Sequence, residues 1–280
     1  MNLKSAIRFL ESPYLRFTPN FCLNDPFENS PSLTTNEHIN SLVGDEGSFF
    51  DRSRRRYQIT GNHMNDYGVI CLSETHDNLL MWSHYCDEHN GVVIEFDIDE
   101  ENIYDIFQQP YREEFDSFLF KKVDYRKSRN IPPNFITGLK GDIGKYYFFI
   151  KSDEWIYEKE HRIALSLFSA DKIYDTKKSS ELPIDVDSDV NLDVSLAIKQ
   201  QLIGSLWYSQ AENGLVFLKE ISKESVAAIY IGHRANRTEV LSAINDGNYE
   251  QLIDAEKGGY QNIYQASPHH SEFKLEFVGV

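Results

Sequence analysis

The chain has 280 residues, of which 41% are hydrophobic and 13% aromatic, so it carries enough apolar material for a folded core and does not resemble a disordered polypeptide. Its 44 acidic and 28 basic side chains give a net charge of −16, which argues against a general nucleic-acid binder because an acidic surface repels phosphate. Three cysteines (Cys22, Cys71 and Cys86) cannot all pair, and no apolar run is long enough to cross a membrane. We therefore expect a cytoplasmic protein with reduced thiols and no membrane contact.

The N-terminal part of the chain predicts a helix, a strand, a loop and a helical segment in that order. Apolar residues recur at helical spacing from Leu3 to Leu10, and Ser12-Pro13 ends that helix. The alternation over 14–18 predicts a strand, and the turn-forming residues of 19–32 predict a loop. The polar stretch 36–66 predicts helix.

The next segment predicts two core strands joined by a helix. Residues 67–74 and 91–98 are apolar at the positions that a buried strand requires. The helix between them covers 77–89, where Asp77 can cap its start and Asn90-Gly91 can end it in the left-handed conformation.

The remaining elements complete a mixed fold. A helix leading into a loop is expected over 141–161, an acidic surface segment over 169–193, and a helix capped by Asn236 over 236–245. Further strands are expected over 119–127, 160–168, 214–219, 226–232 and 273–280. No repeat or linker divides the chain, so the prediction is one α+β domain over 1–280, with a central, partly antiparallel sheet, continuous or split, flanked by helices.

Four motifs carry a resemblance to a known bacterial family. They are "LNDPFE" (23–28), "MWSHYCDEHNGVVIEFD" (81–97), "WIYEKEHRI" (155–163) and "AIYIGHRANRTEVLSAI" (228–244). In this order they resemble the domain of unknown function 2971 (DUF2971) family, whose members are often encoded near phage-defence and toxin genes. The motif order is also similar to that of ADP-ribosyltransferases, especially toxins that modify DNA. The resemblance implies an ADP-ribosyltransferase-like fold, NAD as a substrate, and an antitoxin or other neutralising protein as a partner.

The acidic pair in "YEKEHR" is the leading catalytic candidate. On a strand, Glu158 and Glu160 would share one face, together with Arg162. The resemblance implies that Glu160 holds the 2′-hydroxyl of the nicotinamide ribose and stabilises the positive charge that develops as nicotinamide leaves. It also implies that Glu158 places or deprotonates the acceptor. The residues alone fit a ladder of Glu–Arg salt bridges on a surface or edge strand equally well.

Three residues between 73 and 85 are candidates for the NAD pocket. Ser73 stands where related transferases carry a hydroxyl that braces the catalytic Glu, although Ser also caps helices. Trp82 and Tyr85, three apart on one helix, can stack on a flat ring or fill a core. His84 and His89 are five apart and diverge by about 140° on a helix, so we expect no metal site there.

Basic and turn residues supply the remaining candidates. The resemblance implies that Arg16, on an early strand, binds the NAD phosphates, whereas the residue alone also fits an exposed position. Asn24 and Asp25 form a turn by their chemistry and, with Glu28, are candidates for a pocket rim. The run of arginines over 52–56 is either a solvated charge run or a phosphate contact.

The leading hypothesis is an NAD-dependent ADP-ribosyltransferase-like toxin or effector, acting in phage defence or toxin–antitoxin conflict on nucleic acid or protein. It requires Glu160, Trp82 and Ser73 to face one cavity. One alternative is a non-catalytic module that binds a nucleotide or a partner. The other is a metal-dependent nuclease or hydrolase that uses the carboxylates of Asp25, Glu28, Glu158 and Glu160.

Overall fold

The structure is a computed structural model that describes residues 1–19, 22–28, 30–60, 67–99, 101–107, 118–131, 147–175, 180–181, 215–254, 256 and 258–280. The chain divides into two compact units, each formed from separate segments. The first comprises Met1–Leu15, Ser73–Glu113 and Glu220–Val280, and the second comprises Arg16–Leu72 and Glu114–Lys219. The expected combination of helices with partly antiparallel sheets is confirmed. None of the described helices is long and apolar enough to span a bilayer.

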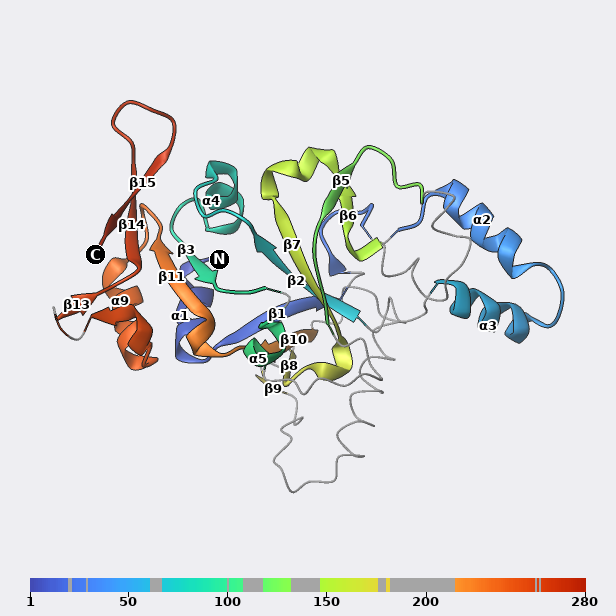
Figure 1. Ribbon diagram of the computed structural model, residues 1–280, viewed down its shortest axis with the longest axis horizontal. Helices are drawn as coiled ribbons and strands as arrows, with labels where there is room; N and C mark the ends of the chain where they lie inside the picture. Colours follow the sequence, from blue (N-terminus) through green and yellow to red (C-terminus); the bar gives the residue numbers. More distant parts are fainter. Residues whose placement is uncertain are drawn as a thin grey trace, which may run out of the picture. The chain divides into compact units, whose positions relative to one another are not determined.

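The first unit is built on a four-stranded sheet with the strand order β15-β14-β11-β3 (Figure 1). β11 runs antiparallel to β3 and parallel to β14, and β15 pairs antiparallel with β14 at the edge of the sheet. Val92, Ile229 and Ile263 bury their side chains almost completely. The predicted strands are confirmed here as β3 (Val92–Phe96), β11 (Val226–Ile231) and β15 (Leu275–Gly279), and they are joined by β14 (Ile263–Pro268).

Among the described residues, four α-helices belong to this unit. They are α1 (Leu3–Glu11), α4 (Leu79–Tyr85), α5 (Ile103–Ile106) and α9 (Arg237–Asp246). α1 packs against α9, and the predicted stop of α1 at Ser12 is confirmed. Asn236 caps α9 as predicted, since its Oδ1 accepts the N–H of Thr238 at 3.2 Å. The described residues of this unit also include the short elements η6 (Lys223–Ser225), η7 (Glu250–Leu252), β12 (Ile253–Asp254) and β13 (Gly259–Tyr260).

Both ends of α4 differ from the prediction. The N-cap is Asn78 and not Asp77, because Asn78 Oδ1 accepts the N–H groups of Leu80 and Met81. Asn90-Gly91 does not supply the left-handed turn either. Asp87, Glu88 and His89 have φ values of 49°, 52° and 70°, so three consecutive non-glycine residues turn the chain.

Most of the second unit's strands form one seven-stranded sheet with the order β4-β7-β2-β1-β10-β8-β9. Their bounds are β1 (Tyr14–Pro19), β2 (Tyr67–Ser73), β4 (Phe118–Lys122), β7 (Glu160–Ser166), β8 (Lys172–Asp175), β9 (Ser180–Glu181) and β10 (Leu215–Glu220). β7 lies between β4 and β2, away from either edge of the sheet. The predicted strand 160–168 is therefore confirmed over most of its length, in a position that packs side chains on both faces.

Further elements of the second unit depart from the predictions in detail. The predicted strand 119–127 is interrupted at Val123, which separates β4 from β5 (Asp124–Arg126). β5 pairs in parallel with β6 (Ile150–Ser152), which leads into the 3₁₀ helix η3 (Asp153–Glu158), and η4 (Leu167–Ser169) follows β7. Several predicted segments lie outside the described residues: 61–66, 141–146, 176–179 and 182–193.

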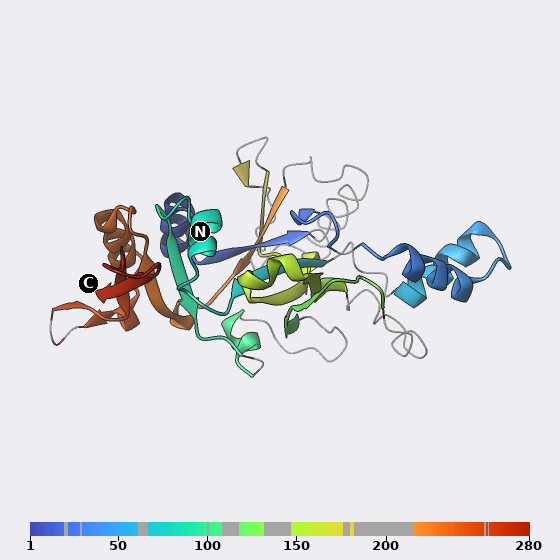
Figure 2. The ribbon, with the colours of Figure 1, turned by 90° about the horizontal axis from the view of Figure 1, so that it is seen from above.

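Two helices extend the second unit. The predicted helical segment forms α2 (Leu33–Val43) and α3 (Phe49–Thr60), which lie side by side (Figures 1 and 2). The arginines of α3 contribute to this pairing. Arg55 Nε donates to the carbonyl of Val43 at 2.8 Å, and Arg56 Nη2 donates to Asn36 Oδ1 at 3.1 Å. Arg55 and Arg56 thus link α3 to α2, which neither alternative for the arginine run had predicted.

Candidate functional site

A buried cluster of charged side chains lies in the second unit, centred on Lys151 of β6. Its ammonium lies 2.6 Å from Glu158 Oε2, 3.4 Å from Glu160 Oε2 and 3.6 Å from Glu28 Oε1. All four side chains are at most 5% exposed. A buried ammonium that contacts three carboxylates has compensated its loss of hydration with direct charge pairing.

Arg162 of β7 joins two of the same carboxylates. Its Nε and Nη2 donate to the two oxygens of Glu160 at 2.8 and 2.9 Å, which is the bidentate arrangement that makes Arg–carboxylate pairs strong. Nη2 also donates to Glu28 Oε1, and Nη1 donates to the carbonyl of Phe148 at 2.9 Å. Arg162 is 1% exposed, so this cluster is not the surface ladder that the sequence also allowed.

The protonation states follow from these contacts. Burial raises the pKa of Glu160, but hydrogen bonds from Arg162 and the charges of Arg162 and Lys151 outweigh it, so the pKa falls below its ordinary value. Burial lowers the pKa of Lys151, but the carboxylates of Glu160, Glu28 and Glu158 raise it by a larger amount. The pKa of Lys151 therefore lies above its ordinary value. Glu160 is thus an ionised, ion-paired carboxylate at neutral pH, and Lys151 is an ammonium.

Local backbone structure explains how the acidic motif reaches Lys151. Glu158 ends η3, Lys159 adopts the left-handed conformation with φ 45°, and Glu160 begins β7. The expectation that Glu158 and Glu160 share a strand face is therefore wrong, because the chain turns between them. Their carboxylates nevertheless meet the same ammonium. The backbone N–H of Glu160 donates to the Tyr125 hydroxyl at 2.8 Å, which anchors the start of β7 to β5.

The "NDPFE" segment brings Glu28 to the cluster. It forms the predicted turn, in which Asp25 Oδ1 accepts the N–H of Phe27 at 2.9 Å and the Asp25 carbonyl accepts the N–H of Glu28 at 3.1 Å. Asp25 and Glu28 are buried, whereas Asn24 is exposed. The turn thus points one carboxylate at Arg162, which lies 134 residues further along the chain.

A pocket of about 200 Å³ adjoins the cluster and shares Glu28 and Lys151 with it. Its other lining residues are Asp25, Phe27, Arg126, Lys127, Ser128, Arg129, Ile150 and Ser152. Asp25 Oδ2 and Glu28 Oε2 are buried and have no hydrogen-bond partner among the described residues. An unsatisfied buried acceptor typically costs about 1–3 kcal/mol, so a ligand that donates hydrogen bonds would relieve a real penalty here.

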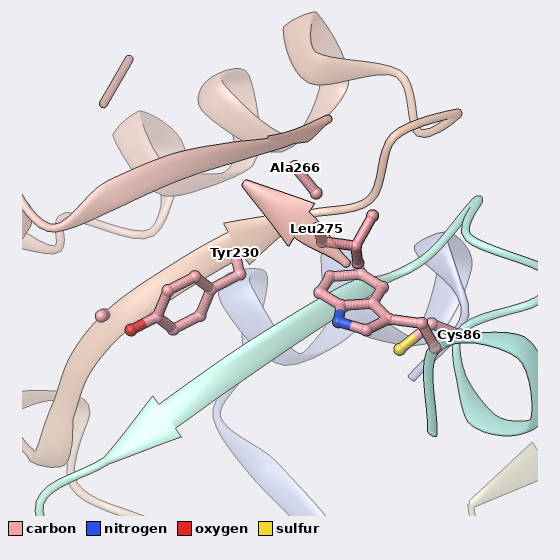
Figure 3. Packing of buried hydrophobic residues seen from close by; sticks show 6 residues of the cluster. Cys86, Tyr230, Ala266 and Leu275 are labelled. Atoms are coloured by element: carbon pink, nitrogen blue, oxygen red, sulfur yellow. The ribbon is translucent and has the colours of Figure 1, made fainter. Parts of the chain in front are cut away.

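Trp82 has a core position in the first unit. It is 0% exposed, and its indole N–H donates to the carbonyl of His76 at 2.6 Å. It packs in one hydrophobic cluster with Cys86, which caps α4, and with buried residues of the four-stranded sheet. Figure 3 shows Cys86, Tyr230, Ala266 and Leu275 of this cluster. The sequence allowed Trp82 either to wall a pocket or to fill a core, and the second alternative describes it.

The other predicted NAD-pocket residues lie on three different elements. Tyr85 is 41% exposed on α4, and the exposed Ser73 donates its hydroxyl to the carbonyl of Thr75 at 3.3 Å. Arg16 is exposed on β1. Glu160 has its hydrogen-bond partner Arg162 in the second unit, and Trp82 has its partner His76 in the first.

The sequence analysis missed all four basic residues that line this pocket. Lys151 stood in a segment predicted as helix into loop, and no motif marked it. Arg126 and Lys127 stood in a segment predicted only as strand, and Arg129 follows two residues after its end. The signal that could have found them is the local excess of bases in "YRKSR" within a strongly acidic chain.

One group of side chains has the spacing of metal ligands within the described part of the chain. Ligand atoms of His269, His270 and Glu276 lie within 4.8 Å of one another. However, His269 Nδ1 accepts the backbone N–H groups of Ser271 and Glu272 at 3.1 and 2.9 Å. Its proton therefore resides on Nε2, 3.3 Å from Glu276 Oε1. A metal would have to displace that proton, so this arrangement favours a hydrogen bond.

These features define an α+β protein with a buried ion-pair cluster beside a small, polar pocket. Residues 81–163 match the sequence model of a family described as a protein of unknown function, DUF2971. This match supports the family resemblance, and its range contains Lys151, Glu158, Glu160 and Arg162. No curated protein and no solved structure shows significant similarity to the chain.

Proposed function

We propose that the chain is an NAD-dependent ADP-ribosyltransferase-like enzyme. It would act as a toxin or effector in bacterial phage defence or toxin–antitoxin conflict, with an acceptor group on nucleic acid or protein and with a neutralising protein as partner. One observation carries the proposal. The carboxylates of two family-like motifs, Glu28 from one and Glu158 and Glu160 from the other, meet on Lys151 and Arg162 next to a pocket.

The proposed chemistry gives each acidic residue a defined role. The bond between C1′ of the nicotinamide ribose and the ring nitrogen breaks, and nicotinamide leaves with the bonding electrons. The ionised Glu160 stabilises the positive charge that develops at C1′. An acceptor oxygen or nitrogen then bonds to C1′ and loses its proton to Glu158 or to water. Because Glu160 does not itself line the pocket, its ion pairs must rearrange when NAD binds.

A second candidate is metal-dependent phosphodiester hydrolysis. It is favoured by the unpartnered oxygens of Asp25 and Glu28, since Mg²⁺ is commonly held by one or two carboxylates together with substrate phosphate and water. The bases at the pocket would then face the phosphate. Against it, these carboxylates do not form a group of three close ligands among the described residues.

Label transfer from NAD tests the proposal. The wild-type chain is incubated with NAD carrying ³²P in its adenylate phosphate and with bacterial lysate, RNA or DNA, beside Glu160→Gln and the control Glu154→Gln. Glu154 is exposed on the adjoining 3₁₀ helix, so the control removes a charge without touching the cluster. Transfer by the wild type and the control that falls by about 100-fold in Glu160→Gln supports the transferase. Circular dichroism confirms that the variant is folded, and Glu158→Gln replaces it if it is not.

Other outcomes contradict the transferase. Label transfer that is unchanged in a folded Glu160→Gln variant removes this carboxylate from the mechanism. Magnesium-dependent cleavage of nucleic acid without NAD favours the hydrolase. No transfer, combined with a rise in the melting temperature when NAD is added, favours a binding module.

A further inference from the structure

The pocket beside the charged cluster concentrates positive charge on a chain whose net charge is −16. Four basic residues line it, against two acidic ones. Lys151 contributes little to attracting an anion, because three carboxylates already surround its ammonium. The attraction comes from the bases of the 126–129 segment, which are Arg126, Lys127 and Arg129.

These three bases differ in their other contacts. Arg126 Nε donates to Asp124 Oδ2 at 2.6 Å, so its charge is partly balanced. Arg129 Nη1 donates to the carbonyl of Ser30 at 3.0 Å, and its guanidinium lies 5.0 Å from the centre of the Phe27 ring. Neither contact of Arg129 is with an anion. Lys127 is exposed and forms no ion pair with any residue that the structure describes. Within the described part of the chain, Lys127 and Arg129 therefore carry charges that no carboxylate pairs, and they offer donors suited to a phosphate.

Two hydrogen-bond acceptors, the carboxylates of Asp25 and Glu28, line the same pocket as the bases. Each has one carboxylate oxygen that is already engaged, Asp25 Oδ1 with the N–H of Phe27 and Glu28 Oε1 with Arg162. The second oxygen of each is buried and lacks a donor among the described residues. Acceptors of this kind call for hydroxyl or amine groups on a ligand. Phe27, whose side chain is 57% exposed, adds an apolar ring to the lining.

We propose that this pocket binds a sugar phosphate. The phosphate contacts Lys127 and Arg129, the sugar hydroxyls donate to Asp25 Oδ2 and Glu28 Oε2, and the sugar ring lies against Phe27. A pocket of about 200 Å³ is smaller than the roughly 300–1,000 Å³ of most small-molecule sites, so the pocket itself suits a unit of this size, and the rest of a larger ligand such as a dinucleotide would lie outside it. The ligand is either a free sugar phosphate or the sugar phosphate part of a nucleotide.

This inference goes beyond the proposed transfer reaction, because it concerns binding in the absence of NAD and of turnover. If label transfer from NAD fails, the binding experiment below can still succeed. If binding fails, transfer from NAD through Glu160 can still be measured.

Isothermal titration calorimetry on the full chain tests the pocket. Ribose 5-phosphate is compared with its two halves, ribose and inorganic phosphate, and with 5′-AMP. We expect ribose 5-phosphate to bind at least about tenfold tighter than inorganic phosphate, because its sugar hydroxyls can donate hydrogen bonds to Asp25 Oδ2 and Glu28 Oε2. If 5′-AMP binds more tightly than ribose 5-phosphate, the natural ligand is a nucleotide. If the two bind equally, the natural ligand is a free sugar phosphate.

Matched variants locate the binding. Lys127→Ala is compared with Lys274→Ala, which removes the same charge from an exposed lysine of the other unit. We expect only Lys127→Ala to weaken ribose 5-phosphate, by about tenfold. Asp25→Asn keeps Oδ1 for the Phe27 N–H but replaces Oδ2 with a donor. It should weaken ribose 5-phosphate by about tenfold and leave inorganic phosphate unchanged.

Two results would overturn the proposal. If inorganic phosphate binds as tightly as ribose 5-phosphate, Asp25 and Glu28 do not bind the sugar hydroxyls. If Lys127→Ala and Lys274→Ala weaken binding equally, the effect reflects the overall charge of the chain, and the ligand does not occupy this pocket.

Discussion

The ammonium of Lys151 lies 2.6 Å from the carboxylate of Glu158, with both side chains only 4% exposed. Lys151 comes from β6 and Glu158 from the end of η3, seven residues later. Because Glu160 and Glu28 contact the same ammonium, Lys151 is the residue on which the two acidic motifs depend. Its removal should therefore have a larger effect than the loss of an ordinary ion pair.

Lys151→Met should lower the free energy of unfolding by about 3–5 kcal/mol, because it leaves buried carboxylates without their shared cation. Urea denaturation at pH 7 measures the change. Lys274→Ala is the control, since it breaks an exposed pair with Glu272 that is worth about 0–1 kcal/mol. Equal effects of the two variants would show that the cluster does not stabilise the fold.

Stability should fall in acid because of Glu160. Its pKa in the folded chain is below the ordinary value of 4.5, so the unfolded chain binds this proton at a higher pH than the folded chain. The stabilisation is complete above pH 4.5 and is lost as the pH falls through the lowered folded pKa. Urea denaturation of the wild type and Glu160→Gln between pH 7 and 3 measures this. The wild type should lose more stability than the variant on acidification, and parallel curves would be evidence against the ion pair.

Trp82→Ala should destabilise the first unit by about 3–5 kcal/mol, because it removes a fully buried indole and leaves a cavity. The control is Tyr85→Ala on the same helix, which removes a ring that is 41% exposed and should cost much less. Thermal denaturation followed by near-ultraviolet circular dichroism compares the two. A larger loss for Tyr85→Ala would contradict the core position of Trp82.

Gly232→Ala should destabilise the chain by about 1–3 kcal/mol or more, the range for overpacked sites. A Cβ at this position would lie 2.3 Å from the carbonyl oxygen of His89 and 2.6 Å from that of Gly91, and both are backbone atoms that cannot rotate away. Gly259→Ala is the control, because a Cβ there would meet nothing within 4 Å. Urea denaturation of the two variants checks the difference, and a neutral Gly232→Ala would show that the backbone at this turn adjusts easily.

Features decided by near neighbours in the chain could be predicted well. The stop of α1 at Ser12, the Asn236 cap and the "NDPFE" turn all depend on contacts within a few residues. Where two adjacent residues could do the same task, as with Asp77 and Asn78, the sequence did not separate them, because both side chains can accept the same N–H groups.

The division into two units could not be predicted from the sequence, because each unit is assembled from separate segments of the chain. The chain passes from one unit to the other at four points, and three of these crossings fall within a strand, in β1, β2 and β10. Pro/Gly-rich linker composition marks boundaries only where a domain is continuous in the chain. A unit assembled from separate segments leaves no such mark.

The sequence by itself determined the class of fold, most of the strands, and the presence of Glu158, Glu160 and Arg162 close together in one motif. Only the tertiary structure decided that these residues are buried, that Lys151 joins them, and that Glu28 arrives from 134 residues before Arg162. The reason is physical. Secondary structure follows from local backbone and side-chain preferences, whereas an ion pair between distant residues exists only when the sheet packs and excludes water around it.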